Sequence, residues 1–304
     1  MKTKSIFFNL LFIGTVFVGC KSQKELNTNQ DIKAIDFTKA YTINNSDFGT
    51  KTSMTISNEK RILKTNSLPN HKTGSFPNEG NPNTISEQKL TYTFPLNPVL
   101  TGHAKWAREF GVAVNGIKFE PETAERFECE TGETYRIEAK QDEFNLGLDF
   151  NNAHVQPTGA YHYHGIPLEL IVQLDNGEDL ILIGYANDGF PIYYSKSENY
   201  KPSFRLSKNP RTGEFCTYSN PKQSTTKNIE NTDPNGIFVS DWEYIEGSGD
   251  LDECNGTMLN GNYVYFATMS YPYIGRCLKG AFSEKRPNGP PPGMRNNKND
   301  KPRK

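Results

Sequence analysis

The sequence predicts a mainly β protein, sandwich- or barrel-like, with long irregular loops and few short helices. Its 304 residues include 25 Gly and 19 Pro, and this density of turn formers favours short strands over long helices. Hydrophobic residues make up 35%, aromatic residues 12%, and the mean hydropathy is −0.70. This composition excludes a multi-span membrane protein and wholesale disorder. Repeated alternation of apolar and polar residues also predicts strands.

Alternating or continuously apolar segments bounded by turn formers predict the strands in chain order. They lie within residues 35–63, 89–95, 134–140, 180–185, 239–245 and 263–269. Residues 110–119 carry Asn115-Gly116 between apolar residues, which predicts a hairpin. Residues 68–82 are dense in Pro, Asn and Gly and predict a loop. Residues 168–174 fit either a strand of a hairpin turning at Asp175-Asn176-Gly177 or a short helix opened by Pro167.

The N-terminus has the features of an export signal. Lys2 and Lys4 precede an apolar run that ends at Gly19-Cys20, as in a secretory leader. The stretch Phe17-Val18-Gly19-Cys20 resembles a bacterial lipobox, so we expect cleavage after Gly19 and lipid on Cys20. An ordinary secretory signal with a free Cys20 is the alternative.

The rest of the chain divides by composition. We expect residues 1–19 to be a lipoprotein signal peptide, 20–34 a polar tether, 35–284 a single domain, and 285–304 a disordered Pro/Asn-rich tail with seven basic residues and one acidic residue.

These features predict a lipid-anchored envelope protein whose first partner is the membrane. Lys21, where Asp would favour retention at the inner membrane, points to the outer membrane, on its periplasmic or its surface face. The chain has 34 basic and 35 acidic residues, so it lacks the overall positive charge that would suggest nucleic acid as a partner.

Four cysteines remain once Cys20 carries lipid, and an exported protein is expected to pair them. Four cysteines allow three connectivities. We favour Cys254 with Cys277, because closing this short loop contributes about 3 kcal/mol through the entropy of the unfolded chain. Cys129 then pairs with Cys216. None has the CxxC spacing of a structural zinc site, and free thiols are the alternative.

Three of the five histidines fall within residues 154–164. His162 and His164 share one face of a strand, because successive side chains alternate between faces. His154 precedes a Pro-Thr-Gly turn that can fold it back beside them. Three imidazole nitrogens suit a divalent transition metal, Zn, Cu or Fe, with a position left open. The structural alternative is a set of half-buried rings that donate to the backbone.

The other two histidines have weaker claims. His71 lies in the predicted loop and is a candidate fourth ligand, although an exposed loop histidine is the commoner outcome. His103 stands near Trp106 and is expected to pack or titrate at the surface.

Asp188 and Glu253 are the candidate catalytic acids or bases, or partners of an imidazole N–H. Asp188 is followed by Gly189, and an Asp in that setting often only caps its own turn. The chain has no Gly-x-Ser-x-Gly elbow, P-loop or dinucleotide fingerprint. Serine hydrolysis, nucleotide use and hydride transfer are therefore unsupported.

Several ordered motifs resemble the YHYH-domain family of exported bacterial proteins. The likeness covers about residues 66–282 and rests on Tyr161-His162-Tyr163-His164, Gly184 to Tyr193, Leu251 to Gly256, Gly111 to Gly116 and the loop from Pro69 to Asn83. The resemblance implies no biochemical function. Where relatives repeat Tyr-His-Tyr, this chain has Tyr263-Val264-Tyr265-Phe266. We therefore take the first cluster as the site and the second as packing.

Two functions follow as hypotheses. The first is a His-based metal site of unknown reaction, hydrolytic or oxidative, in an anchored envelope protein. The second is a non-catalytic module that binds a carbohydrate or a protein, which the aromatic residues, the many Asn and the long loops would suit. Whether the protein is an enzyme, and which small molecule, glycan or protein it binds, stays open at the level of sequence.

Overall fold

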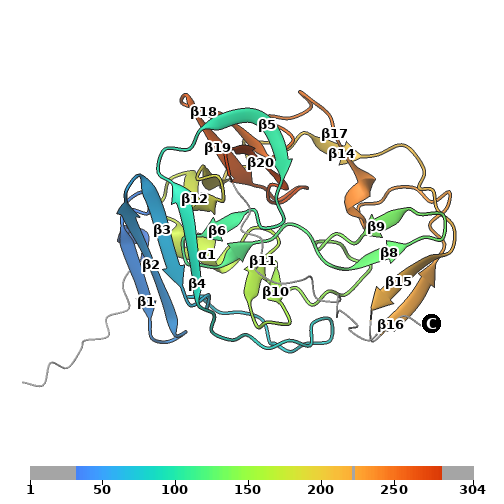
Figure 1. The fold of residues 1–304 in the computed structure, drawn as a ribbon, viewed down its shortest axis with the longest axis horizontal. Helices are drawn as coiled ribbons and strands as arrows, with labels where there is room; N and C mark the ends of the chain where they lie inside the picture. The colour runs from blue at the N-terminus through green and yellow to red at the C-terminus, as the bar shows by residue number, and fades with distance from the viewer. Residues whose placement is uncertain (1–31, 221–222, 283–304) are drawn as a thin grey trace, which may run out of the picture.

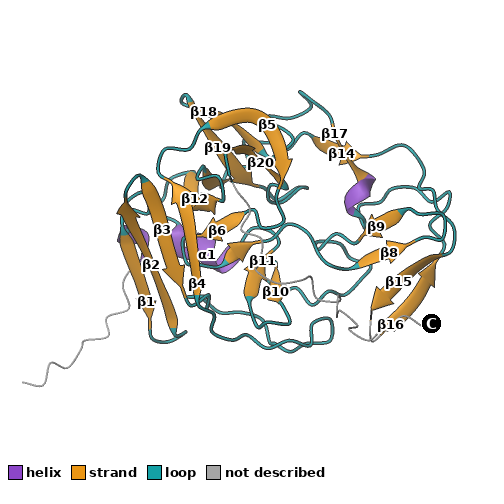
Figure 2. Cartoon of the chain, viewed as in Figure 1, coloured by secondary structure: helices purple, strands orange, loops and turns teal. Residues whose placement is uncertain are grey.

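A computed structural model describes residues 32–220 and 223–282. Within these ranges strands dominate, α1 (Leu168–Leu174) is the α-helix, and η1 (Ile32–Ala34) and η2 (Val239–Asp241) are short 3-10 turns (Figure 2). The fold is mainly β with long loops, as predicted, and no sheet of the described residues closes into a barrel. The expected signal peptide, Cys20 and the basic tail lie outside the described residues.

The N-terminal strands form an antiparallel sheet in the order β1-β2-β3-β4, seen in blue to teal at the left of Figure 1. Its strands are β1 (Tyr41–Asn45), β2 (Thr50–Ser57), β3 (Lys60–Thr65) and β4 (Leu90–Pro95). Along β2, alternate side chains are buried, as a sheet with one covered face requires. Ile43, Met54, Leu63 and Phe94 contribute to the main hydrophobic core.

An eight-stranded mixed sheet forms the centre of the molecule, in the order β10-β11-β7-β6-β12-β13-β19-β18. Its strands are β6 (Gly111–Ala113), β7 (Lys118–Phe119), β10 (Ala153–Val155), β11 (Tyr161–Tyr163), β12 (Leu180–Ala186), β13 (Pro191–Ser195), β18 (Gly256–Leu259) and β19 (Asn262–Ala267). The pairs β11–β7 and β13–β19 are parallel, and the other pairs are antiparallel. Strands far apart in sequence therefore lie side by side.

A smaller sheet lies at the opposite side from β1–β4 (Figure 1), in the order β16-β15-β8-β9. Its strands are β8 (Arg126–Glu128), β9 (Thr134–Arg136), β15 (Cys216–Asn220) and β16 (Gln223–Lys227). It has a hydrophobic cluster of its own, which includes Phe127, Ile137 and Phe238. This cluster is separate from the main core.

Two ribbons complete the fold. They pair β5 (Leu100–Trp106) with β20 (Cys277–Gly280), and β14 (Phe204–Leu206) with β17 (Trp242–Tyr244). Every residue of β5 is exposed. Among the described residues, no helix has the length and apolar character needed to span a bilayer.

The segment 168–174 is a helix, so the hairpin alternative is wrong there. Leu170, Ile171 and Leu174 are buried on one face, the spacing of an amphipathic helix. The hairpin of residues 110–119 forms as β6 and β7, and Gly116 adopts a positive φ of 87° in its turn. The segment predicted as a strand at 239–245 begins instead with the turn η2 before β17.

Candidate metal centre

Two neighbouring strands bring the clustered histidines together. β10 and β11 are antiparallel, with His154 directly opposite His162. His164 follows β11 two residues after His162, and therefore lies on the same face. The sequence 157–159 makes the turn that folds β10 back onto β11. The three rings meet because of this pairing, as the sequence predicts.

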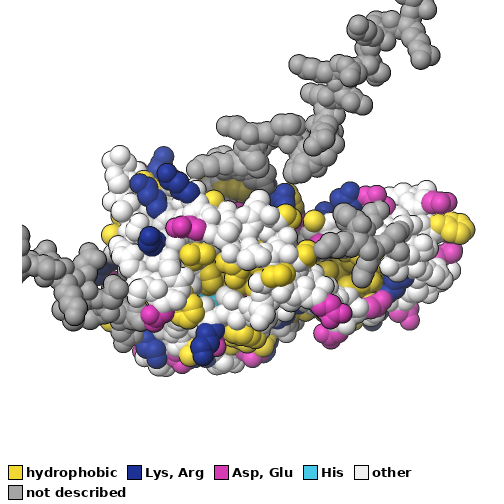
Figure 3. Space-filling model, turned by 90° about the horizontal axis from the view of Figure 1, so that it is seen from below, with side chains coloured by type: hydrophobic (Ala, Val, Ile, Leu, Met, Phe, Trp, Pro, Cys, Tyr) yellow, Lys and Arg dark blue, Asp and Glu magenta, His cyan; other side chains and the backbone are white. Residues whose placement is uncertain are grey.

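The three imidazoles converge on one point. The Nε2 atom of His164 lies 3.1 Å from Nε2 of His154 and 2.9 Å from Nε2 of His162. Each pair of ring centroids is 4.7 Å apart. All three side chains are buried, and only a small area of histidine reaches the face shown in Figure 3. These three residues form a group that can hold a metal ion.

Backbone contacts fix which nitrogens carry hydrogen. His154 Nδ1 lies 2.8 Å from the Leu146 carbonyl and His162 Nδ1 lies 3.2 Å from the Ala160 carbonyl. A carbonyl only accepts, so both Nδ1 atoms donate, and both neutral rings direct an Nε2 lone pair at His164. Nε2 of His164 carries at most one hydrogen, so it can donate to only one of these two Nε2 atoms. Its own Nδ1 is buried with no hydrogen-bond partner among the described residues. A cation at the shared point would satisfy the facing lone pairs.

Burial keeps these rings in the neutral form that binds metals. Burial lowers the pKa of His154. It lowers the pKa of His162 and of His164 well below the ordinary value, and the neighbouring imidazoles of the triad lower both further. Neutral imidazole is the ligand form. The triad is therefore ready to bind a metal ion at neutral pH without first losing protons.

The two tyrosines of the motif point to the other face of β11 and fix the adjacent loops. Tyr161 donates to Asp149 at 2.7 Å. The Tyr163 hydroxyl lies 2.6 Å from His71 Nε2 and accepts from Asn115 Nδ2 at 2.9 Å. Because side chains alternate along β11, the tyrosines of Tyr-His-Tyr-His anchor loops on one face of the strand and the histidines lie on the other.

His71, the candidate fourth ligand, does not join the triad. Its Nδ1 donates to the Lys72 carbonyl at 2.8 Å, so its Nε2 accepts from Tyr163. Both ring nitrogens are occupied. His71 is buried, which differs from the exposed loop position that was the alternative. It joins the predicted loop to β11 from the tyrosine face.

The parallel partner β7 places two charged side chains beside the triad, which the sequence analysis missed. Lys118 is in register with His162. The next pair in the ladder is Tyr163 with Phe119, and Glu120 N donates to the Tyr163 carbonyl at 3.0 Å. Lys118 and Glu120 therefore lie on the histidine face, next to His162 and His164. Both residues precede the Tyr-His-Tyr-His motif by more than forty positions, so no local sequence pattern connected them with it.

Glu120 is a buried carboxylate held by three donors. It contacts Lys118 Nζ at 2.6 Å, Gln156 Nε2 at 2.6 Å and Arg108 Nε at 3.2 Å. Burial, the largest single influence, would raise the pKa of Glu120, but Lys118, His164 and Arg108 together lower it more, so on balance the pKa lies below the ordinary value. Glu120 is therefore an anion beside the histidines, and its charge raises the pKa of His164 in part.

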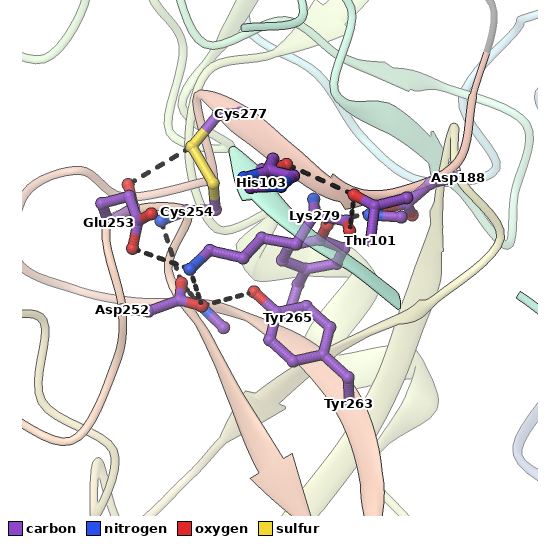
Figure 4. Close-up of a disulfide and its surroundings, with 12 residues drawn as sticks. Thr101, His103, Asp188, Asp252, Glu253, Cys254, Tyr263, Tyr265, Cys277 and Lys279 are labelled. Atoms are coloured by element: carbon purple, nitrogen blue, oxygen red, sulfur yellow. Dashed lines mark hydrogen bonds and ion pairs between the residues drawn. A yellow bond between two sulfur atoms is a disulfide. The ribbon is translucent and has the colours of Figure 1, made fainter. Parts of the chain in front are cut away.

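Asp188 and Glu253, the candidate acids, lie elsewhere in the fold (Figure 4). Asp188 is buried and accepts from Tyr265 at 2.6 Å and from Gly280 N at 2.9 Å. Glu253 pairs with Lys279 at 3.0 Å. Within the part of the chain that the structure describes, neither is hydrogen-bonded to a triad histidine. These two hydrogen bonds of Asp188 hold β20 against β19.

His103 and Val264 lie away from the triad as well. His103 is on the exposed strand β5. Val264 is buried in β19, in an apolar cluster with Leu251 and Phe266. The second aromatic segment is thus packing at this position.

Both expected disulfides are present, Cys129–Cys216 and Cys254–Cys277. Stable disulfides form in oxidising compartments. The protein is therefore extracytoplasmic.

A family model described as "YHYH protein" matches residues 91–280, which is more than half of the chain. The chain belongs to the YHYH family. The matched region contains the triad, Glu120 and both disulfides, whereas the loop that carries His71 precedes it. Neither a curated protein nor a solved structure matches the chain.

Proposed function

We propose that this YHYH protein is a metalloprotein in which His154, His162 and His164 hold one divalent transition metal ion. The observation that carries the proposal is the convergence of three buried Nε2 atoms, two of which must present lone pairs to the third ring. Three neutral imidazoles suit Zn, Cu or Fe. Three protein ligands leave a coordination position for a small molecule.

Glu120 would balance the charge of such an ion. It is an anion next to His164 and is held in place by Lys118, Gln156 and Arg108. A metal ion bound here would act as a Lewis acid or lower the pKa of water. The chain would contribute a fixed donor set, a nearby carboxylate and a largely buried setting. The reaction, hydrolytic or oxidative, follows from the ion that is bound.

Metal analysis of the purified mature protein tests the proposal. We expect about one metal ion per chain in the wild type and a loss of at least tenfold in the double variant His162→Ala/His164→Ala, because a single remaining imidazole binds weakly. His103→Ala is the matched control, since it removes an exposed histidine of β5 and should keep the metal. Wild-type protein that stays free of metal after incubation with Zn, Cu and Fe would refute the proposal.

We also propose that lipid on Cys20 anchors the protein to the outer membrane. The lipobox-like sequence, Lys21 after Cys20 and the two disulfides support this location. Expressed in a bacterium, the wild type should incorporate labelled fatty acid and sediment with membranes, whereas Cys20→Ser should do neither. Incorporation that is equal in the two proteins would contradict the proposal.

A further inference from the structure

A cleft with a volume of about 410 Å³ lies at the β18 edge of the central sheet, the opposite edge from the triad on β10 and β11. This volume is within the range of small-ligand sites. The residues that line it include Leu100, Tyr244, Asp250, Met258, Tyr263 and Lys279. They come from β5, β17–β20 and the loop before Asp252. No residue of the proposed metal centre takes part.

One wall of the cleft is fixed by a hydrogen-bond network around Asp252 (Figure 4). This carboxylate accepts from Cys254 N at 2.9 Å, from Gly256 N at 3.0 Å and from Tyr263 Oη at 2.7 Å. A Cβ at Gly256 would lie 2.1 Å from the Tyr263 hydroxyl, so glycine is needed there. The Cys254–Cys277 disulfide joins this turn to β20. The wall is therefore formed before any ligand binds.

Carboxylates dominate the charge of the cleft. Lys279 Nζ is paired with Asp252 at 3.3 Å and with Glu253 at 3.0 Å, so its charge is already neutralised. Asp250 also lines the cleft, and its side chain is exposed. Burial raises the pKa of the Tyr244 hydroxyl, and the charges of Glu253 and Glu246 raise it further. The cleft thus favours a cation over an anion or a neutral ligand.

Aromatic and apolar side chains accompany these acids. Tyr244 and Tyr263 line the cleft. Tyr263 is buried and bonded to Asp252, whereas Tyr244 is only partly buried, and a tyrosine ring attracts ammonium and guanidinium groups. Met258 is 56% exposed and Leu100 is 44% exposed. Such side chains can pack against the methylene stem of a long basic residue, whose charged end then reaches the acids.

We propose that this cleft is a second ligand site, which binds the side chain of a lysine or arginine presented by a peptide. The ammonium or guanidinium group lies beside Asp250 and the Tyr244 ring, and the stem lies against Met258 and Leu100. The site is independent of the metal centre.

Calorimetric titration with the peptide acetyl-Lys-Lys-Lys-amide tests this proposal. We expect saturable binding that falls about tenfold when the lysines are Nε-acetylated, since acetylation removes the charge. The substitutions Asp250→Asn and Tyr244→Leu should each weaken binding about fivefold, because one charge or one ring is lost. His162→Ala should leave it unchanged, which separates this site from the proposed metal centre.

The matched control is Asp233→Asn, which removes one exposed acid outside the cleft. If Asp233→Asn weakens binding as much as Asp250→Asn, the peptide senses only the general negative charge and the proposal is wrong. Equal binding of the acetylated peptide would overturn it, and so would no binding of acetyl-Lys-Lys-Lys-amide. Saturable binding of cellohexaose at Tyr244 without binding of the peptide would assign the cleft to a neutral saccharide instead.

Discussion

Saturating zinc should raise the free energy of unfolding of the metal-free wild type by about 3 kcal/mol when free zinc exceeds its dissociation constant about a hundredfold. The three Nε2 atoms already converge in the folded chain, whereas the unfolded chain offers no such set. Binding energy therefore becomes folding energy. His164→Ala should lose nearly all of this gain, because His164 Nε2 contacts both other ligands.

Urea unfolding at neutral pH, with zinc and with a chelator, measures this difference. The control is again His103→Ala, which should keep the full gain. If zinc stabilises His164→Ala as much as the wild type, the ion binds elsewhere. If zinc stabilises neither protein, the triad is a set of packed aromatic rings.

Removing the Cys129–Cys216 disulfide should destabilise the protein by about 4–5 kcal/mol, more than the loss of any other single crosslink in the described chain. The two cysteines are 87 positions apart, and the entropy that a crosslink removes from the unfolded chain grows with loop length. This bond also joins the residue that follows β8 to the start of β15, in a sheet whose hydrophobic cluster is separate from the main core. The smaller sheet should therefore unfold first.

The comparison is between Cys129→Ser/Cys216→Ser and Cys254→Ser/Cys277→Ser, measured by urea unfolding without reductant. The second pair spans 23 positions, and its removal should cost about 3 kcal/mol. A larger loss for the second double variant would contradict the loop-length argument. Lysine-peptide binding should also weaken in that variant, because the disulfide holds a wall of the cleft.

Most of the fold class was predictable because the local signals were strong. Alternation of apolar and polar residues located β2 and β4, an apolar run located β12, and the Asn115-Gly116 turn located the β6–β7 hairpin. Residues 168–174 could not be assigned from sequence, because a seven-residue apolar run fits a buried strand and an amphipathic helix equally well. The packing of this segment against the hydrophobic core selects the helix.

The candidate site divides in the same way. The strand period alone put His162 and His164 on one face, and a short turn returned His154 to them, so local sequence contained the triad. Glu120 and Lys118 were invisible to that reasoning. They reach the histidines only because β7 pairs in parallel with β11, a contact between segments more than forty positions apart.

The chain itself determined the β class, the three convergent histidines and the cysteines available for pairing, because each depends on neighbours along the backbone. Tertiary structure alone decided that His71 bonds to Tyr163, that Asp188 fastens β20, and that Glu120 lies beside His164. These roles depend on which distant strands become adjacent. Sheet order is fixed by burial of the whole core, and no local pattern encodes it.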